Sequence, residues 1–167
     1  SSFHSRKSAG WFFCCWFASA GWTRRDIEEH SAGLLCFTGG ADGFLHHHIK
    51  RHRGQEALAW LKYVFEGRLY VELQRHNLPH EEAVNQTLLA LAHKFRLPYF
   101  ASNGPYYAAQ RDRELFDVFT CIKNHCTIEN AGRLISENSE RYLRSAAQMA
   151  YQFDDYPQAV AATVELA

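Results

Sequence analysis

Polar side chains of the types used in acid–base and metal chemistry gather at the end of one segment of this sequence. Residues 69–76 alternate apolar and polar side chains, as is typical of a strand, and include Glu72, Arg75 and His76. A histidine directly after a strand can act as a general base or as a metal ligand. More often such a histidine orders the following loop through hydrogen bonds, and this is the role that we expect for His76.

A second candidate is the histidine cluster formed by His46, His47 and His48, with His52 close by in sequence. Adjacent histidines point in different directions from the backbone, so they rarely converge on one metal ion. No carboxylate or cysteine accompanies them at the spacing of a metal site. We therefore expect a solvated polar turn, and metal binding is the alternative.

Cysteines give a third candidate. Cys121 and Cys126 flank His125, but no second pair of ligands occurs at the spacing of a zinc site. The chain has five cysteines, an odd number, and their positions are not those of a disulfide framework. Reduced thiols in a cytoplasmic protein are therefore the expected state.

The charge balance limits what the chain can bind. The 167 residues carry a formal net charge of +0, so no overall basic field attracts nucleic acid. The C-terminal third nevertheless has a basic side that could contact a DNA backbone, and simple solvation of that side is an equal alternative. Its residues are Lys123, Arg133, Arg141 and Arg144.

Alternating strands and helices must position these groups. Apolar runs at residues 34–40, 69–76 and 99–107 predict three buried strands that end in polar or glycine-rich loops. The segments between them are long enough for helical crossovers, so we expect parallel strands. Helices are predicted over residues 23–31, 55–66, 81–96, 111–124, 145–154 and 157–167.

Two further expectations concern the ends of this pattern. In the helix at 111–124, Leu115, Val118, Phe119 and Ile122 recur at helical spacing, and we expect this face to pack inward. Residues 1–22 imitate a signal peptide, but their apolar run at 11–17 is too short to span a bilayer. We expect instead a piece of core cut from its context or a misread, non-native start. The chain lacks an initiator Met and ends inside a helical pattern, so we expect a fragment.

From about Arg25 onward the sequence resembles the bacterial DNA polymerase III alpha subunit, a C-family polymerase. The resemblance is to the C-terminal half of its PHP (polymerase and histidinol phosphatase) domain and the helices that follow. The forms TGG, SNGPYY and FTCIKNHCT are most similar to the error-prone branch. The matching pieces are GLLCFTGG at 33–40, YVELQRHNLPHEEAVNQTLLALAHKFRLP at 70–98, ASNGPYY at 101–107, ELFDVFTCIKNHCTIENAGRL at 114–134 and NSERYLRSAAQMAYQFDDYPQAVAATVELA at 138–167.

The resemblance implies a fold and a division of the chain. The expected fold class is α/β: a partial PHP-type barrel, a distorted TIM-like barrel with parallel strands, followed by an α-helical C-terminal segment. Residues 23–110 would form the second half of the PHP domain, and residues 111–167 would lead into the polymerase palm. Residues 1–22 stay unassigned.

The resemblance also implies that a metal site has been lost. Many family members bind metal ions at the strand ends of the PHP domain and use them in a proofreading exonuclease. The ligand positions that fall in this chain carry Gly40, Gly104 and Tyr106, where the family has Cys, Asp and His. Glycine offers no side chain, and a neutral tyrosine is a poor ligand for a hard divalent ion. We expect a vacant site with no catalytic residue and no cofactor, and His76 is the remaining candidate ligand.

The implied parent enzyme extends DNA with Mg²⁺ bound to palm carboxylates beyond residue 167. This segment would then be a scaffold that packs against the palm and thumb, works in the cytoplasm, meets DNA through the parent and does not contact membranes. Two alternatives stay open. One is an active PHP-type phosphoesterase or 3′–5′ exonuclease that uses His76, His46–His48 and upstream ligands. The other is a module that binds the DNA backbone.

Overall fold

The computed structural model describes residues 23–40 and 43–167, together with the backbone of 12–14. The chain divides into two compact units, and each unit is built from two stretches of sequence. Unit 1 comprises residues 1–73 and 86–100, and unit 2 comprises residues 74–85 and 101–167. The predictions of a signal-like or non-native segment at 1–22 fall outside the described residues, apart from the backbone of one short strand.

An open sheet carries the strand ends that the sequence singles out. Its order is β1-β2-β3-β4, and the pairs β1–β2 and β2–β3 are parallel. The three predicted strands are therefore confirmed, and the described residues form an open sheet rather than a closed barrel. The strands are β1 (Phe12–Cys14), β2 (Leu35–Phe37), β3 (Leu69–Gln74) and β4 (Tyr99–Ser102).

Helix α1 (Arg24–His30) begins where the sequence predicts. The Thr23 hydroxyl accepts a hydrogen bond from the Asp26 backbone N–H, and the Asp26 carboxylate accepts the Thr23 N–H at 2.7 Å. This reciprocal capping box satisfies two backbone donors that the first turn of a helix leaves without partners. Thr23 and Asp26 therefore fix the start of α1 through local chemistry alone.

The histidine cluster lies on a helix, and the prediction of a solvated polar turn is wrong. His46, His47 and His48 belong to α2 (Phe44–Ile49), and His46 is buried. A Cβ atom at Gly43 would lie 2.6 Å from the backbone carbonyl oxygen of Thr38, so only glycine lets the chain enter α2 so close to the end of β2.

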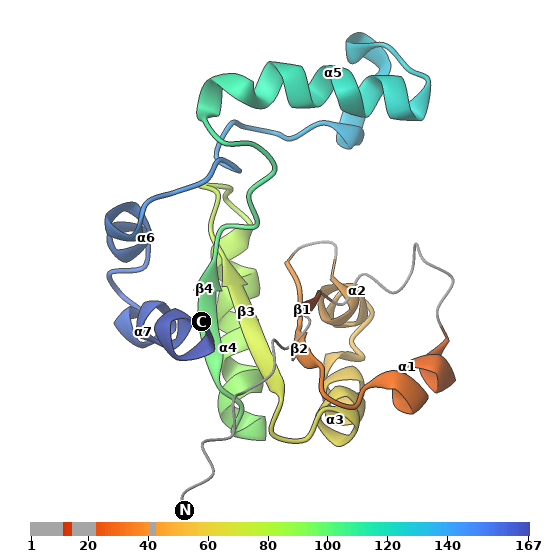
Figure 1. The fold of residues 1–167 in the computed structure, drawn as a ribbon, viewed down its shortest axis with the longest axis vertical. Coiled ribbons are helices and arrows are strands. Elements are labelled where there is room, and N and C mark those ends of the chain that lie inside the picture. Colours follow the sequence, from red (N-terminus) through yellow and green to blue (C-terminus); the bar gives the residue numbers. More distant parts are fainter. Residues whose placement is uncertain (1–11, 15–22, 41–42) are drawn as a thin grey trace, which may run out of the picture. The chain divides into compact units, whose positions relative to one another are not determined.

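The core of unit 1 forms between the sheet and its helices. Helix α2 packs against α3 (Gly54–Val64), and α4 (Glu81–Phe95) follows β3 (Figure 1). The helix predicted at 55–66 corresponds to α3, and its apolar residues Leu58, Leu61 and Phe65, at i, i+3 and i+7, are each no more than 1% exposed. The other buried apolar residues of this core include Leu45, Leu69, Val71, Leu73, Leu88 and Leu91.

Unit 2 continues with helices after β4, as predicted. These are α5 (Arg113–Asn124), α6 (Ala146–Gln152) and α7 (Pro157–Leu166), and Figure 1 traces them in green to blue. Three short 3₁₀ turns interrupt the connections, at Gln110–Asp112, Ile128–Asn130 and Gly132–Leu134. Within the described residues, no helix combines the length and the apolar character needed to cross a bilayer.

The predicted inward face of α5 is wrong. Leu115, Phe119 and Ile122 are 59%, 61% and 63% exposed, and Val118 is 39% exposed. The helix buries Asp117 and Cys121 on another face instead. Spacing alone correctly identifies an apolar stripe, but it cannot identify the surface that the stripe faces.

Candidate functional site

The residues that follow β3 and β4 meet the C-terminal part of unit 2. The backbone N–H of Tyr106 donates to the carbonyl oxygen of Arg141 at 2.8 Å, and the N–H of Leu143 donates to the carbonyl oxygen of Tyr107 at 3.0 Å. These bonds surround a parallel bridge between Tyr107 and Tyr142. A segment about 35 residues later in the chain therefore pairs with the loop after β4 as a strand would.

His76 lies at the centre of this region and is 1% exposed. Its Nδ1 lies 2.6 Å from Oε1 of Glu81, and its Nε2 lies 2.7 Å from the carbonyl oxygen of Asn103. Its own carbonyl oxygen accepts a hydrogen bond of 2.6 Å from the side-chain amide of Asn138. Every polar group of His76 thus bonds to another part of unit 2, which is the geometry of a loop-ordering residue.

The Glu81 carboxylate accepts hydrogen bonds from the backbone N–H groups of His76 and Leu78, and it lies beside the His76 ring. Burial would raise the pKa of Glu81, but hydrogen bonds from the His76 ring and from the N–H groups of His76 and Leu78 outweigh it and hold that pKa below its ordinary value.

Asn103 connects the loop after β4 to the same C-terminal segment. Its side-chain amide donates to the carbonyl oxygens of Tyr142 at 2.5 Å and Glu140 at 3.3 Å. Its side-chain oxygen accepts a hydrogen bond of 3.2 Å from Nε of Arg144, whose guanidinium also pairs with the Glu140 carboxylate. The Arg144 side chain is only 8% exposed, so this ion pair is largely shielded from water.

Arg75 joins the segment that follows β3 to the end of α6 and the turn before α7. Its guanidinium forms two hydrogen bonds to Asp155, at 2.6 and 2.7 Å, and one of 2.9 Å to Glu82. It also lies over the rings of Phe153 and Tyr156, about 5 Å from each ring centre. The hydrogen bonds to Asp155 raise the pKa of Arg75, and the same contact lowers the pKa of the Asp155 carboxyl.

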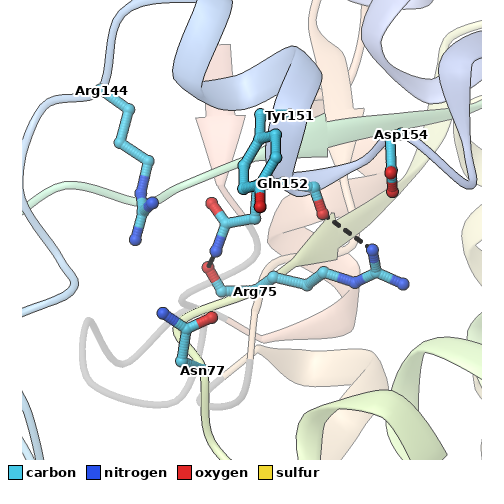
Figure 2. A pocket seen from close by; sticks show the side chains of 6 residues that line it. All are labelled: Arg75, Asn77, Arg144, Tyr151, Gln152 and Asp154. Atoms are coloured by element: carbon cyan, nitrogen blue, oxygen red, sulfur yellow. Dashed lines mark hydrogen bonds between the residues drawn. The ribbon is translucent and has the colours of Figure 1, made fainter.

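A pocket of about 420 Å³ opens beside this contact. Figure 2 shows Arg75 and Gln152 joined by hydrogen bonds in both directions: Arg75 donates to the Gln152 carbonyl at 2.8 Å, and the Gln152 amide donates to the Arg75 carbonyl at 2.7 Å. The full lining consists of Arg75, Asn77, Arg144, Tyr151, Gln152 and Asp154.

The two arginines of this pocket do not make it an anion site. Arg75 is paired with Asp155 and Glu82, and Arg144 is paired with Glu140. Asp154 adds a carboxylate to the lining. A phosphate would have to compete with carboxylates already bound to both guanidinium groups, so the pocket offers little net positive charge.

Gly104 and Tyr106, at two of the positions where the resemblance implies metal ligands, make other contacts in the structure. Gly104 has a φ of +48°, and a Cβ there would lie 2.9 Å from Nε2 of Gln74, so the Gln74 side chain fills the space beside it. The Tyr106 ring stacks on Phe116 with centroids 5.0 Å apart and lies beneath Arg141. Across residues 23–40 and 43–167, no three His, Cys, Asp or Glu side chains are placed to share a metal.

The other sequence candidates are not gathered at this site. Glu72 is buried in unit 1, where its backbone N–H donates to the Thr38 hydroxyl at 3.0 Å. Gly40 and the histidines of α2 also belong to unit 1. Cys121 is buried and Cys126 half-buried at the end of α5, and burial, with the nearby Cys126 thiol, raises the pKa of Cys121.

The four DNA-backbone candidates differ in their surroundings. Lys123 and Arg133 are exposed. Arg141 is half-buried, and its guanidinium lies 4.8 Å from the ring centre of Tyr106. Arg144 is half-buried and pairs with Glu140 as described above. Only the first two therefore present their charges as freely as a contact to phosphate requires.

Sequence reasoning missed most of the partners of His76 and Arg75. Asn138 and Asp155 lie 62 and 80 residues away from them in sequence, and no periodic pattern links positions so far apart. The one local signal is Glu81, which follows His76 by five residues and opens a helix. An acid in the first turn of a helix, a few residues after a histidine at a strand end, is a usable sign of such a pair.

Comparison with known proteins gives consistent relatives, although no protein-family model matches the chain. It is 31% identical over 145 residues to the DNA polymerase III subunit alpha of Borreliella burgdorferi, covering 85% of this chain and 13% of that protein. It is 32% identical over 148 residues to the same subunit of Rickettsia bellii, covering 86% and 12%. It is 32% identical over 139 residues to the error-prone DNA polymerase of Pseudomonas aeruginosa, covering 83% and 12%. The chain thus spans only 12–13% of the length of these relatives.

Proposed function

Because this chain belongs by sequence to the DNA polymerase III alpha subunits and error-prone DNA polymerases, we propose that it is one segment of a longer DNA-directed DNA polymerase. The parent would transfer nucleotides to a primer 3′ end with Mg²⁺, using palm carboxylates outside residues 1–167. Its partners would be DNA and the rest of its own chain. Since it must reach chromosomal DNA, it would work in the bacterial cytoplasm.

Within that enzyme, we propose that this segment is a degenerate PHP scaffold without a metal ion. The hydrogen-bonded strand ends carry the proposal. His76 and Asn103, which follow β3 and β4, bond to Glu81, Asn138 and other groups of unit 2, so their polar atoms are already used. Gly40, Gly104 and Tyr106 at the ligand positions support the same interpretation.

We propose the error-prone branch over the replicative one. The relatives do not separate the two, because both kinds are 31–32% identical to this chain. The support comes from the motifs TGG, SNGPYY and FTCIKNHCT. Copying accuracy of the full-length polymerase on a defined template would test the assignment, and accuracy typical of a replicative polymerase would contradict it.

One experiment tests the scaffold proposal against the phosphoesterase alternative. The full-length protein is purified without chelator, its zinc and manganese are quantified, and primer extension and primer digestion are assayed side by side. We expect extension with Mg²⁺, no stoichiometric metal retained after dialysis and no metal-dependent digestion. Retained metal with digestion that His76→Ala abolishes would favour a phosphoesterase, and absence of primer extension would overturn the polymerase assignment.

DNA-backbone binding is the second candidate, and the exposure of Lys123 and Arg133 favours it. If these residues contact phosphates, Lys123→Ala with Arg133→Ala should weaken DNA binding and flatten its dependence on salt concentration, by a slope of about one per lost contact. Lys50→Ala with Arg51→Ala, two exposed cations of unit 1, is the matched control. Equal affinities and slopes for both double variants would exclude this role.

A further inference from the structure

Helix α5 is attached to its own unit by its polar side. Arg113 donates to the Ser136 carbonyl oxygen at 2.5 Å and lies 3.3 Å from the buried Asp117 carboxylate. Cys121 is buried on the same side of the helix, one turn further on. The Phe116 ring stacks against Tyr106. These contacts fix which face of α5 points into unit 2.

The face that remains is the apolar one. Leu115, Val118, Phe119 and Ile122 stand at positions i, i+3, i+4 and i+7, and they are 39–63% exposed. We call these four residues the α5 stripe. Helices of globular proteins normally bury such a stripe and expose their polar side, so α5 has the opposite orientation. The 3₁₀ turns after α5 add two more exposed apolar side chains, Ile128 and Leu134.

We propose that the α5 stripe is a docking surface for another part of the same polypeptide, outside residues 1–167. This inference rests on the proposed function, in which the chain is one segment of a longer polymerase. Anchors at i, i+3, i+4 and i+7 are the pattern of a helix that lies in an apolar groove or against another helix. The occupant is therefore an apolar groove or helix face.

Chain length supports an occupant within the same polypeptide. The match to the relatives extends over 83–86% of this chain but only 12–13% of theirs. In each relative, the sequence outside the matching segment is therefore roughly seven times as long as the segment itself. A segment embedded in so much more chain has covalently linked partners at high effective concentration, which favours intramolecular docking over pairing of two copies.

Photo-crosslinking in the full-length protein tests the proposal. A benzophenone amino acid replaces Phe119 in one variant and Ile122 in another, and Tyr63, which is 80% exposed in unit 1, is replaced in the control. After irradiation, the adducts are mapped by mass spectrometry. We expect both stripe positions to crosslink to apolar residues beyond 1–167 of the same chain, and the control not to.

Each other outcome would overturn the proposal. Adducts within residues 23–100 would mean that this chain covers its own stripe. Adducts in a band of twice the mass would mean that a second copy covers it. No adduct at either position would mean that the stripe faces water. Primer extension by the same preparations keeps the proposed function separate, since its loss in unmodified protein would contradict the polymerase assignment and not the docking.

A second measurement uses substitution. Phe119→Asp with Ile122→Asp should lower the melting temperature of the full-length protein by several degrees, because a docked stripe cannot bury two carboxylates. Tyr63→Asp is the control and should leave the melting temperature unchanged within a degree. Equal melting temperatures for the two variants would contradict docking, and if the double variant does not fold, the crosslinks still decide.

Discussion

The Nε2 atom of His76 lies 2.7 Å from the carbonyl oxygen of Asn103, and this contact joins the chain after β3 to the chain after β4. Both ring nitrogens of His76 have protein partners within hydrogen-bond distance. The two loops are therefore connected to each other at this point.

His76→Ala should loosen both loops. It would remove a hydrogen-bond partner from the Glu81 carboxylate and from the Asn103 carbonyl, which lie away from water. The free energy of unfolding should fall by about 1–3 kcal/mol. Hydrogen exchange of amides in 74–78 and 102–107 should accelerate by about 5- to 150-fold as a result. His80→Ala, at an exposed position four residues away, is the control. Equal exchange in the two variants would show that the ring contributes nothing.

The Glu81 carboxylate should make unit 2 sensitive to acid. Its pKa in the folded protein lies below the ordinary value, so folding favours the ionised form. The resulting stabilisation is complete above the unfolded pKa and is lost as the pH falls through the folded pKa. The difference in opening free energy between wild type and Glu81→Gln should therefore shrink from pH 7 to pH 3. Glu66→Gln, an exposed control, should show no such convergence.

Arg75→Lys should release α6 and α7. Lysine keeps the charge but cannot form the two parallel hydrogen bonds to Asp155 or stack in the same way on Phe153. We expect a loss of about 1–2 kcal/mol, allowing for the half-exposed Asp155 carboxylate. Amide exchange in 146–157 reports it, and a double-mutant cycle with Asp155→Asn isolates the pair. A coupling energy of zero in that cycle would contradict the contact.

Gly104→Ala should cost more than Gly132→Ala. Both glycines have a positive φ, +48° and +52°. Both substitutions therefore place a Cβ on a left-handed backbone, which destabilises the protein by about 1–2 kcal/mol. Only at Gly104 would the new Cβ also meet a neighbour, Nε2 of Gln74 at 2.9 Å. Adding Gln74→Ser to Gly104→Ala should restore the stability lost to that clash, as measured by urea unfolding. Equal losses at the two glycines would mean that Gln74 simply moves aside.

Local chemistry made the elements predictable. Thr23 and Asp26 define the start of α1 through side chains only three residues apart. Leu58, Leu61 and Phe65 recur at helical spacing in the predicted helix at 55–66, and all three are buried. Such features depend on neighbours along the chain, which a single sequence displays directly.

Contacts between residues far apart in the sequence were not predictable, and neither was one short helix. The spacing of the α5 stripe is correct, yet its direction depends on Arg113 reaching Ser136 and on Asp117 being buried. Helix α2 is only six residues long and has no apolar periodicity to reveal it. Arg75 finds Asp155 across 80 residues. For α5 and Arg75, the partner that decides the structure lies outside the sequence window in which a pattern can be recognised.

The network around His76 and Arg75 also determines where this chain can be divided. Its contacts run from residues 75, 76 and 103 to residues 138–155, so a cut after residue 109 separates the two sides of the network without breaking a helix, a strand or a 3₁₀ turn. Two polypeptides, one ending at 109 and one starting at 110, would have to find each other again to rebuild unit 2. The segments after β3 and β4 would then form the interface between the two polypeptides, with the side-chain amide of Asn103 and the guanidinium of Arg75 as its main contacts.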